Sequence, residues 1–370
     1  MSIKRTVKNC VSDYQERRLI RLRREYETRK FEDPRRSKIY ESVDLTSEQK
    51  QQIDELYLTN YGEKIPYTWH RHYTAFTGNF DPAYFPELLY IPEFEHFMNR
   101  DAAYRKVVSD KNILPLLAAG AGVRMPRTIF SSVAGVLRDG TGCLSDLESI
   151  KRSLPREKLF AKPSVESGSG KGCILLDPGS ETFDEDVNQL GKDFVVQERI
   201  ACSNSVKTLH PESVNTFRVM TYLWNGKIEV VPQIMRIGCG ESFLDNAHAG
   251  GIFIAVNGDG TLHDRAFSEF RDVYTEHPDT HIRFQDYQIR NFHKIPETAI
   301  RMHSAIPQIG VVNWDFTMGE DEEPVLIEAN LFAGGIWIFQ MAWGKGPFGD
   351  KTEEILRWIR EQKSFLGSRR

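Results

Sequence analysis

Two carboxylates near the C-terminal end of the sequence are spaced to share one metal ion. Asp315 lies in the apolar segment 309–316, Glu328 lies in the segment 324–329, and Asn330 follows two residues later. If the segments pair as a hairpin, alternate residues point the same way, so the carboxylates can lie side by side. Such oxygen donors suit Mg²⁺, which proteins hold with one or two carboxylates and substrate phosphates. The pattern predicts a β-hairpin whose side chains bind Mg²⁺. The alternative is an acidic hairpin with salt bridges on one face.

A glycine- and serine-rich stretch, residues 164–172, could cover a phosphate chain. It carries Lys171, and Lys162 ends the strand-like segment before it. Glycine backbones let N–H groups approach phosphate oxygens, and a lysine adds a point charge. The stretch is not a P-loop, because Val165 stands where the first glycine is needed, and a strand-like segment follows where a dinucleotide-binding turn needs a helix. We predict a hairpin loop over phosphates; the alternative is an ordinary hairpin tip.

Other strand-like segments carry polar side chains that could bind a nucleotide and its partner substrate. The segment 194–200 is apolar until Gln197 and Glu198, and such a strand can offer hydrogen bonds to the edge of a flat base. Three further polar residues punctuate the next strand-like segments: Asn215, Arg218 and Arg236. Arginine binds carboxylate or phosphate through two parallel hydrogen bonds, although each arginine alone could equally form a surface salt bridge.

The N-terminal hundred residues are polar and helical at first and then rich in aromatic side chains. Residues 14–38 are strongly basic, which we interpret as a solvated helix face in preference to a membrane or nucleic-acid patch. Thr46 and Gln49 have the spacing of a helix capping box. His70 and His72 could line a substrate pocket or could be packed core residues. A single helix is predicted over residues 101–120, before mixed strands and helices that indicate an α+β fold.

Composition excludes several classes of protein. The 370-residue chain has a net charge of −4 and a pI of about 6.2, so no general attraction to nucleic acid is expected. No apolar run reaches the ~20 residues of a spanning helix, and no secretory signal is recognised. The five cysteines are scattered without a C-x-x-C pair, which indicates a reducing compartment and a cytoplasmic protein, and we interpret Cys173, Cys202 and Cys239 as packing residues.

The order of these segments resembles the ATP-grasp superfamily. A lysine strand, a glycine-rich hairpin, a Gln-Glu strand, an arginine strand and D…E-x-N follow one another over residues 158–335. A closer resemblance is to the bacterial sugar-transfer-associated ATP-grasp family, which shows similar segments at 69–71, 81–87, 210–218 and 246–251. This implies an α+β fold of two subdomains that grip ATP, after a helical, aromatic-rich N-terminal extension. The expected units are residues 1–100, 101–155, 156–205 and 206–370.

The resemblance also implies roles for single residues. The ATP contacts would be Lys111, Lys162, Ser167, Gly168, Ser169, Gly170, Lys171, Gln197, Glu198 and Ile200. Two Mg²⁺ ions, with Mn²⁺ as an alternative, would be held by Asp315, Glu328 and Asn330. Asn215, Arg218 and Arg236 would face the transferred phosphoryl group, and the acceptor side would comprise Asn246, Gly250 and Gly251 together with His70 and His72. Residues 201–204 lack the acidic ribose-binding residue common in the superfamily, so Asn204 or a backbone group would serve there.

The implied reaction is carboxylate–amine ligation through an acyl phosphate, in surface-polysaccharide or other glycoconjugate biosynthesis. Its substrates would be a small carboxylate and a small amine, one of them sugar-linked. A kinase that stops at phosphoryl transfer is one alternative, and a nucleotide-binding module without catalysis is another. The identity of the substrates and the oligomeric state stay open at this point.

Overall fold

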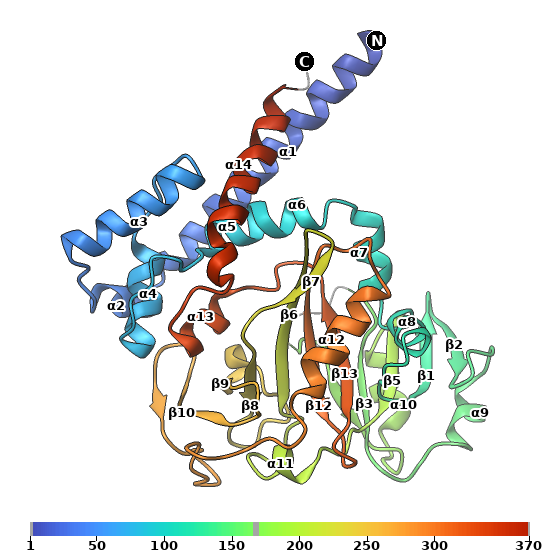
Figure 1. Cartoon of the computed structure of the whole chain (residues 1–370). Coiled ribbons are helices and arrows are strands. Elements are labelled where there is room, and N and C mark those ends of the chain that lie inside the picture. Colours follow the sequence, from blue (N-terminus) through green and yellow to red (C-terminus); the bar gives the residue numbers. More distant parts are fainter. Residues whose placement is uncertain (1–2, 166–169, 369–370) are drawn as a thin grey trace.

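The computed structural model describes residues 3–165 and 170–368, and its strands form two antiparallel sheets (Figure 1). The smaller sheet has five strands in the order β2-β1-β5-β3-β4. They are β1 Thr128–Val133, β2 Val136–Asp139, β3 Leu159–Pro163, β4 Ile174–Leu176 and β5 Phe194–Glu198. Two short helices, α9 (Leu147–Lys151) and α10 (Phe183–Gln189), close its apolar core. The expected units 101–155 and 156–205 therefore both contribute strands to this one sheet.

The larger sheet has eight strands in the order β11-β10-β9-β8-β6-β12-β13, with β7 paired to β6. They are β6 Thr216–Trp224, β7 Lys227–Val230, β8 Ile234–Ile237, β9 Ile252–Val256, β10 Leu262–Phe267, β11 Val273–Tyr274, β12 Val311–Met318 and β13 Pro324–Asn330. Both faces are covered, because neighbouring side chains of β6 enter different cores: Val219 packs with α12 (Lys294–Ser304), and Met220 packs with the N-terminal helices. Every residue of β12 is consequently buried.

Helices from both ends of the chain form the layer over the second face of the larger sheet. They are α1 Ile3–Arg29, α2 Pro34–Glu41, α3 Ser47–Asn60, α4 Thr68–Thr77, α5 Glu87–Leu89, the π-helix η2 Tyr90–Glu95, α6 His96–Met98, α13 Trp337–Trp343 and α14 Thr352–Ser368. The aromatic-rich segment supplies much of the core beneath them, and Thr46 and Gln49 form the predicted capping box of α3. Helices α1 and α14 pack together and project from the body (Figure 1).

Smaller elements complete the chain. They are the helices α7 Ala102–Ser109, α8 Leu114–Gly120 and α11 Asn204–Lys207, and the 3-10 turns η1 Lys30–Glu32, η3 Ala247–Ala249 and η4 Gly349–Lys351. The prediction of one helix over 101–120 is wrong, because the chain breaks between α7 and α8. At the break the Asp110 carboxylate accepts a hydrogen bond from the backbone of Asn112, 2.8 Å away, and Pro115 stands in the first turn of the new helix, which begins at Leu114. The break carries Lys111, whose backbone N–H donates to the carbonyl of Ser164.

The mixture of helices and antiparallel sheets confirms the α+β prediction. No helix in the described part of the chain is long and apolar enough to span a membrane.

Candidate active site

A cavity of about 450 Å³ opens between the two sheets, and its lining residues come from segments between Lys111 and Ile338. Strands β3, β4 and β5 line one side, and β6, β8, β12 and β13 line the other. The predicted site residues that line it are Lys111, Lys162, Gly170, Gln197, Glu198, Ile200, Arg218, Arg236, Asn246, Asp315, Glu328 and Asn330. Ser167, Gly168 and Ser169 lie outside the described residues, and Lys171 is exposed beside Gly170.

The register of the larger sheet sets the first row of charges in this cavity. Asp315 on β12 is directly opposite Arg218 on β6 and directly opposite Glu328 on β13. Side chains that face each other across antiparallel strands lie on the same face of the sheet. Asn330 joins the row, because its amide nitrogen donates to Oδ2 of Asp315 at 3.3 Å. The carboxylates therefore lie side by side on the cavity wall, as the hairpin pattern predicts.

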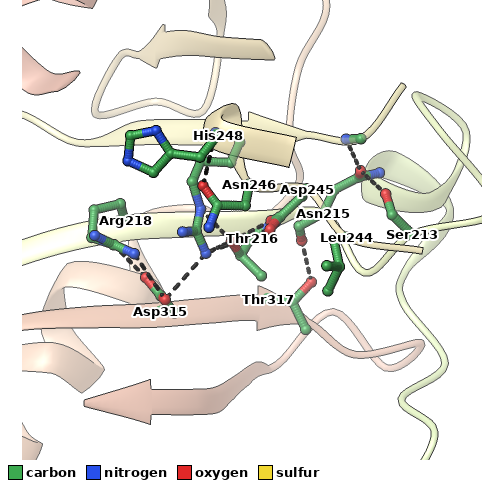
Figure 2. A network of polar contacts seen from close by, with 12 residues as sticks. Ser213, Asn215, Thr216, Arg218, Leu244, Asp245, Asn246, His248, Asp315 and Thr317 are labelled. Carbon is green, nitrogen blue, oxygen red and sulfur yellow. Dashed lines mark hydrogen bonds and ion pairs between the residues drawn. The ribbon is translucent and has the colours of Figure 1, made fainter. Parts of the chain in front are cut away.

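Asp315 is buried between two guanidinium groups (Figure 2). Arg218 donates to both carboxylate oxygens, through Nε to Oδ1 and through Nη2 to Oδ2, the second bond being 3.0 Å long. Nη2 of Arg236 lies 3.1 Å from Oδ2. Burial alone would raise the pKa of Asp315, but the two arginines outweigh it and hold that pKa below its usual range. The carboxylate therefore stays ionised at neutral pH.

Arg236 is fixed in place by two residues that the sequence analysis missed. Its Nη2 donates to the hydroxyl of Thr216 at 2.6 Å, and Thr216 donates through its backbone N–H and its hydroxyl to Asp245 (Figure 2). Asp245 also lies 3.5 Å from Nη2 of Arg236. Burial raises the pKa of Asp245, although Arg236 and Thr216 oppose that rise. The only sequence signals were their positions, directly after Asn215 and directly before Asn246.

Two lysines complete the cationic lining and connect the two sheets. Nζ of Lys111 lies 3.3 Å from Oε1 of Glu328, and Nζ of Lys162 on β3 donates to the carbonyl of Ile327 on β13 at 3.4 Å. Both lysines are buried. Burial lowers the pKa of Lys162, and Glu328 partly offsets this. Four buried or half-buried cations therefore line the cavity, Lys111, Lys162, Arg218 and Arg236, and each could offer positive charge to a phosphate oxygen.

The oxygen donors of the β12–β13 hairpin fit a divalent cation. Two carboxylates and an amide share one cavity wall, and each carboxylate already contacts a cation from another element. Carboxylates this close together need positive charge between or beside them. Asp315, Glu328 and Asn330 are thus the residues that could hold Mg²⁺, which takes hard oxygen ligands.

The cavity wall around residues 197–200 combines polar and apolar groups, which suits a flat ring with polar atoms at its edge. The Gln197 amide donates to the carbonyl of Pro126 at 3.2 Å, and the Glu198 carboxylate accepts from the backbone of Arg127 at 3.0 Å. These two side chains are therefore engaged with the segment before β1. Apolar side chains line the cavity between the sheets: Leu175, Ile200, Val214 and Ile327. A ring could be enclosed there, with backbone groups available at its edge.

Asn215 does not line this cavity, which corrects the prediction that it faces the reacting groups. Its side chain is fully buried, accepts hydrogen bonds from the hydroxyl of Ser213 and the backbone of Gly238, and donates to two backbone carbonyls. It anchors the start of β6 and thereby positions Thr216 and Arg218. Gly250 and Gly251 also lie outside the lining: Gly250 ends η3 with φ of 95°, and a Cβ on Gly251 would lie 2.4 Å from the Asp245 carbonyl.

His70 and His72 are core residues of the N-terminal layer and do not reach the cavity. Both are buried in α4. His70 shares a hydrogen bond of 3.1 Å with the carbonyl of Pro82, and the ring of His72 lies 5.1 Å from that of Phe31. Burial lowers the pKa of His70 to about 4 and that of His72 to about 3. The helix period turns both rings into the aromatic core, so the alternative of packed histidines holds.

The segment after β13 forms a cavity wall that the sequence analysis did not assign to single residues. It includes Phe332, Gly334 and Trp337. Two buried carboxylates from the N-terminal layer hold its backbone. Glu95 accepts hydrogen bonds from the N–H groups of residues 333 and 334 at 2.8 and 3.1 Å, and Glu87 accepts from those of residues 336 and 337 at 2.6 and 3.0 Å. The only signal in the sequence was acidic residues in an otherwise aromatic, apolar stretch.

One comparison with known proteins finds a matching family. A family model described as sugar-transfer-associated ATP-grasp matches residues 91–355, well over half of the chain. No curated protein matches the sequence.

Solved structures that resemble the chain include several ligases. The VanG D-Ala:D-Ser ligase from Enterococcus faecalis is 14% identical, with a TM-score of 0.44 over 71% of this chain and 64% of that one. D-alanyl-alanine synthetase A from Vibrio cholerae is 15% identical, with a TM-score of 0.42 over 70% and 66%. The ATP-grasp ligase PsnB is 11% identical, with a TM-score of 0.40 over 72% and 62%. The chain thus spans less than two thirds of the length of each of these ligases.

Proposed function

The chain belongs to the sugar-transfer-associated ATP-grasp family, and from this premise we propose that it is an ATP-dependent ligase that joins a carboxylate to an amine. One observation carries the proposal: Arg218 and Arg236 converge on Asp315, which lies directly opposite Glu328, in a cavity that also contains two buried lysines. A site for nucleotide binding alone would not need paired arginines beside paired carboxylates. Such a set suits the transfer of a phosphoryl group, in which charge must be neutralised and spread.

The residues of the cavity divide into a nucleotide side and a reaction side. Lys111 and Lys162 would neutralise phosphate oxygens, and Gly170 and Lys171 would approach them from the glycine-rich stretch. The base would lie between the sheets, against the backbone of residues 197–200. Asp315, Glu328 and Asn330 would hold two Mg²⁺ ions, which neutralise phosphate charge when bound. Arg218 and Arg236 would hold the carboxylate substrate and the phosphoryl group that it receives.

The proposed reaction proceeds in two steps. A carboxylate oxygen attacks the terminal phosphorus of ATP, the bond to the bridging oxygen breaks, and ADP leaves. The amine nitrogen then attacks the acyl carbon, the bond to the phosphate oxygen breaks, and inorganic phosphate leaves with the electron pair. The half-buried Arg218 and the buried Arg236 would hold the acyl phosphate inside the cavity, which limits its exposure to water. The family name points to a sugar-linked substrate, so we propose a sugar acid or an amino sugar as one partner.

A substrate screen tests the proposal. Purified protein is incubated with Mg²⁺-ATP and pairs of carboxylates and amines, including sugar acids and amino sugars, and ADP and inorganic phosphate are measured. We expect release of both only when acid and amine are present together, and a hydroxamate when hydroxylamine replaces the amine. AMP with pyrophosphate would instead indicate an adenylate. A stable phosphorylated product formed without amine would indicate a kinase, and tight ATP binding without consumption by any pair would indicate a nucleotide-binding module.

A further inference from the structure

His248 is presented to the cavity by a short structural motif, N-A-H-A-G-G, at residues 246–251. The Asn246 side-chain oxygen accepts a hydrogen bond from the backbone N–H of His248 at 3.1 Å and so begins the turn η3 (Figure 2). Gly250, with φ of 95°, ends the turn, a conformation that a residue with a side chain adopts only with strain. The flanking residues thus shape the backbone around one half-exposed histidine on the cavity wall.

The His248 ring is oriented by a buried carboxylate. Its Nδ1 lies 2.6 Å from Oε2 of Glu269, which is 8% exposed. Glu269 is itself held by Arg36 of α2, whose Nη2 lies 2.8 Å from Oε1. The ring of Trp337, another cavity residue, lies 5.8 Å from the imidazole. The other ring nitrogen, Nε2, has no hydrogen-bond partner among the described residues, while Nδ1 is fixed.

This arrangement is that of a general base with its orienting carboxylate. A base needs one ring nitrogen available to the substrate and a partner that sets the tautomer and stabilises the imidazolium after proton transfer. Glu269 serves Nδ1 in this way, and Arg36 holds the other oxygen of the Glu269 carboxylate. The charged groups around His248 are accordingly Glu269, Arg36 and Arg35, the last of which also influences Glu269.

We propose that Nε2 of His248 takes the proton from the attacking amine in the second step of the ligation. The inference rests on the proposed function and adds a catalytic residue to it. As the C–N bond forms and the acyl C–O bond breaks, the phosphate leaves with the electron pair. The proton that the amine nitrogen must lose moves to Nε2, and Glu269 stabilises the resulting positive charge. The first step, attack of the carboxylate on ATP, needs no proton transfer to His248.

The two steps separate the role of His248 from general damage to the site. The acid and amine that support ADP release by the wild-type protein are used, and the same acid is used with hydroxylamine, a strong nucleophile that is a free base at neutral pH. For His248→Gln at pH 7 we expect amide formation to fall about 10²-fold or more, the usual contribution of a general base. Hydroxamate formation should fall less than about 5-fold, since that nucleophile depends little on a base.

A pH profile supplies the second readout. With the natural amine, the deficit of His248→Gln should shrink as pH rises and more of the amine is unprotonated, whereas a structural defect would persist at every pH. Glu269→Gln keeps a hydrogen-bond partner but loses its charge, and it should show a smaller deficit of the same kind. The control is His281→Gln, which removes a histidine 3.3 Å from Glu276 on an exposed surface; its activity should equal that of the wild type.

Three results would overturn the inference. Equal losses of amide and hydroxamate would make His248 a structural residue, and unchanged amide formation would remove it from the reaction. If no tested acid–amine pair led the wild-type protein to consume ATP, the proposed function would fail and this inference with it. That last failure is seen in the wild type before any variant is compared, so it is distinct from the other two.

Discussion

Asp315 and Glu328 each contact cations supplied by other elements: two guanidinium groups for Asp315 and the ammonium of Lys111 for Glu328. The two carboxylates differ in surroundings, because Asp315 is almost fully buried and Glu328 is half-buried. A metal ion that bound Asp315 would therefore take Glu328 as its second carboxylate by replacing a single contact, the ion pair between Glu328 and Lys111.

Glu328→Gln tests this metal assignment. The amide keeps the size of the side chain but removes the charge, so ATP turnover should fall at least about 10²-fold and the Mg²⁺ concentration needed for nucleotide binding should rise. Steady-state turnover and calorimetric titration of ATP at several Mg²⁺ concentrations measure both effects. The control is Glu320→Gln in the exposed turn of the same hairpin. A folded Glu328→Gln protein with near-normal turnover would contradict the assignment.

His72 makes the stability of the protein depend on pH. Its pKa falls from 6.5 to about 3 on burial, so below pH 6.5 the unfolded chain binds a proton that the folded protein does not. The free energy of unfolding should therefore fall as pH is lowered from 6.5, by about 2 kcal/mol at pH 5 for this residue. Phe in place of His72 fits the aromatic surroundings and should remove that part of the loss.

Urea unfolding at pH 7 and pH 5 checks this expectation. Between pH 7 and pH 5, the free energy of unfolding should fall less in His72→Phe than in the wild type. In the exposed His281→Gln it should fall as much as in the wild type. Because His72 lies in the core, His72→Phe should bind Mg²⁺-ATP as the wild type does. Equal acid sensitivity of His72→Phe and wild type, or lost nucleotide binding in a folded His72→Phe, would contradict the assignment of this histidine to the core.

At the scale of elements, the wall formed by residues 331–338 depends on a helical segment more than 200 residues earlier in the sequence. Glu87 and Glu95 accept hydrogen bonds from four backbone N–H groups of this wall. An irregular segment cannot pair its own N–H groups as a helix or strand does, so it needs outside acceptors when it is buried. Glu87 and Glu95 therefore help to shape the cavity, although neither side chain lines it.

Hydrogen exchange measures this support directly. The N–H groups of residues 333 and 334 donate to different oxygens of Glu95, so in Glu95→Gln one of them faces an NH₂ group and loses its acceptor. We expect faster amide exchange at residues 333–337 in Glu95→Gln than in the wild type, and weaker Mg²⁺-ATP or substrate binding. Glu93→Gln is the matched control, because Glu93 is equally buried but pairs with Arg24 and Tyr61. Unchanged exchange at 333–337 in Glu95→Gln would show that the wall does not depend on this carboxylate.

At the scale of the whole molecule, the N-terminal hundred residues share one apolar core with the larger sheet. That core joins Trp69, Tyr90 and Phe94 to Met220 and Phe253 of the sheet. Burial of such large side chains contributes about 1.5–3 kcal/mol each. The N-terminal layer is thus part of the same folding unit as the sheet that carries the arginines and carboxylates of the cavity.

A fragment of residues 101–370 tests that unity. Because its larger sheet would expose one face, we expect the fragment to aggregate or to bind a hydrophobic dye, and to bind Mg²⁺-ATP poorly. Co-expression with residues 1–100 on a separate chain should restore solubility, which serves as the control for the truncation itself. A soluble, monomeric fragment that binds Mg²⁺-ATP like the full chain would show that the N-terminal layer is a separate unit.

Local patterns determined the elements that carry the cavity residues. Apolar runs bounded by turn residues predicted β12 and β13, and alternation placed Asp315 and Glu328 on one face, since side chains in a strand alternate between faces. The order of the segments also indicated the ATP-grasp family. Such signals are readable because they depend on neighbours along the chain.

Only the tertiary structure decided which polar residues face the cavity. Asn215 and Thr216 are adjacent, yet the first is enclosed by backbone groups and the second lies beside Arg236. His70 and His248 both lie in segments that resemble family motifs, yet His70 enters an aromatic core and His248 lines the cavity. The difference arises from contacts between segments far apart in sequence, which fix burial and hydrogen-bond partners. A local periodicity cannot predict these contacts, because it depends only on neighbours along the chain.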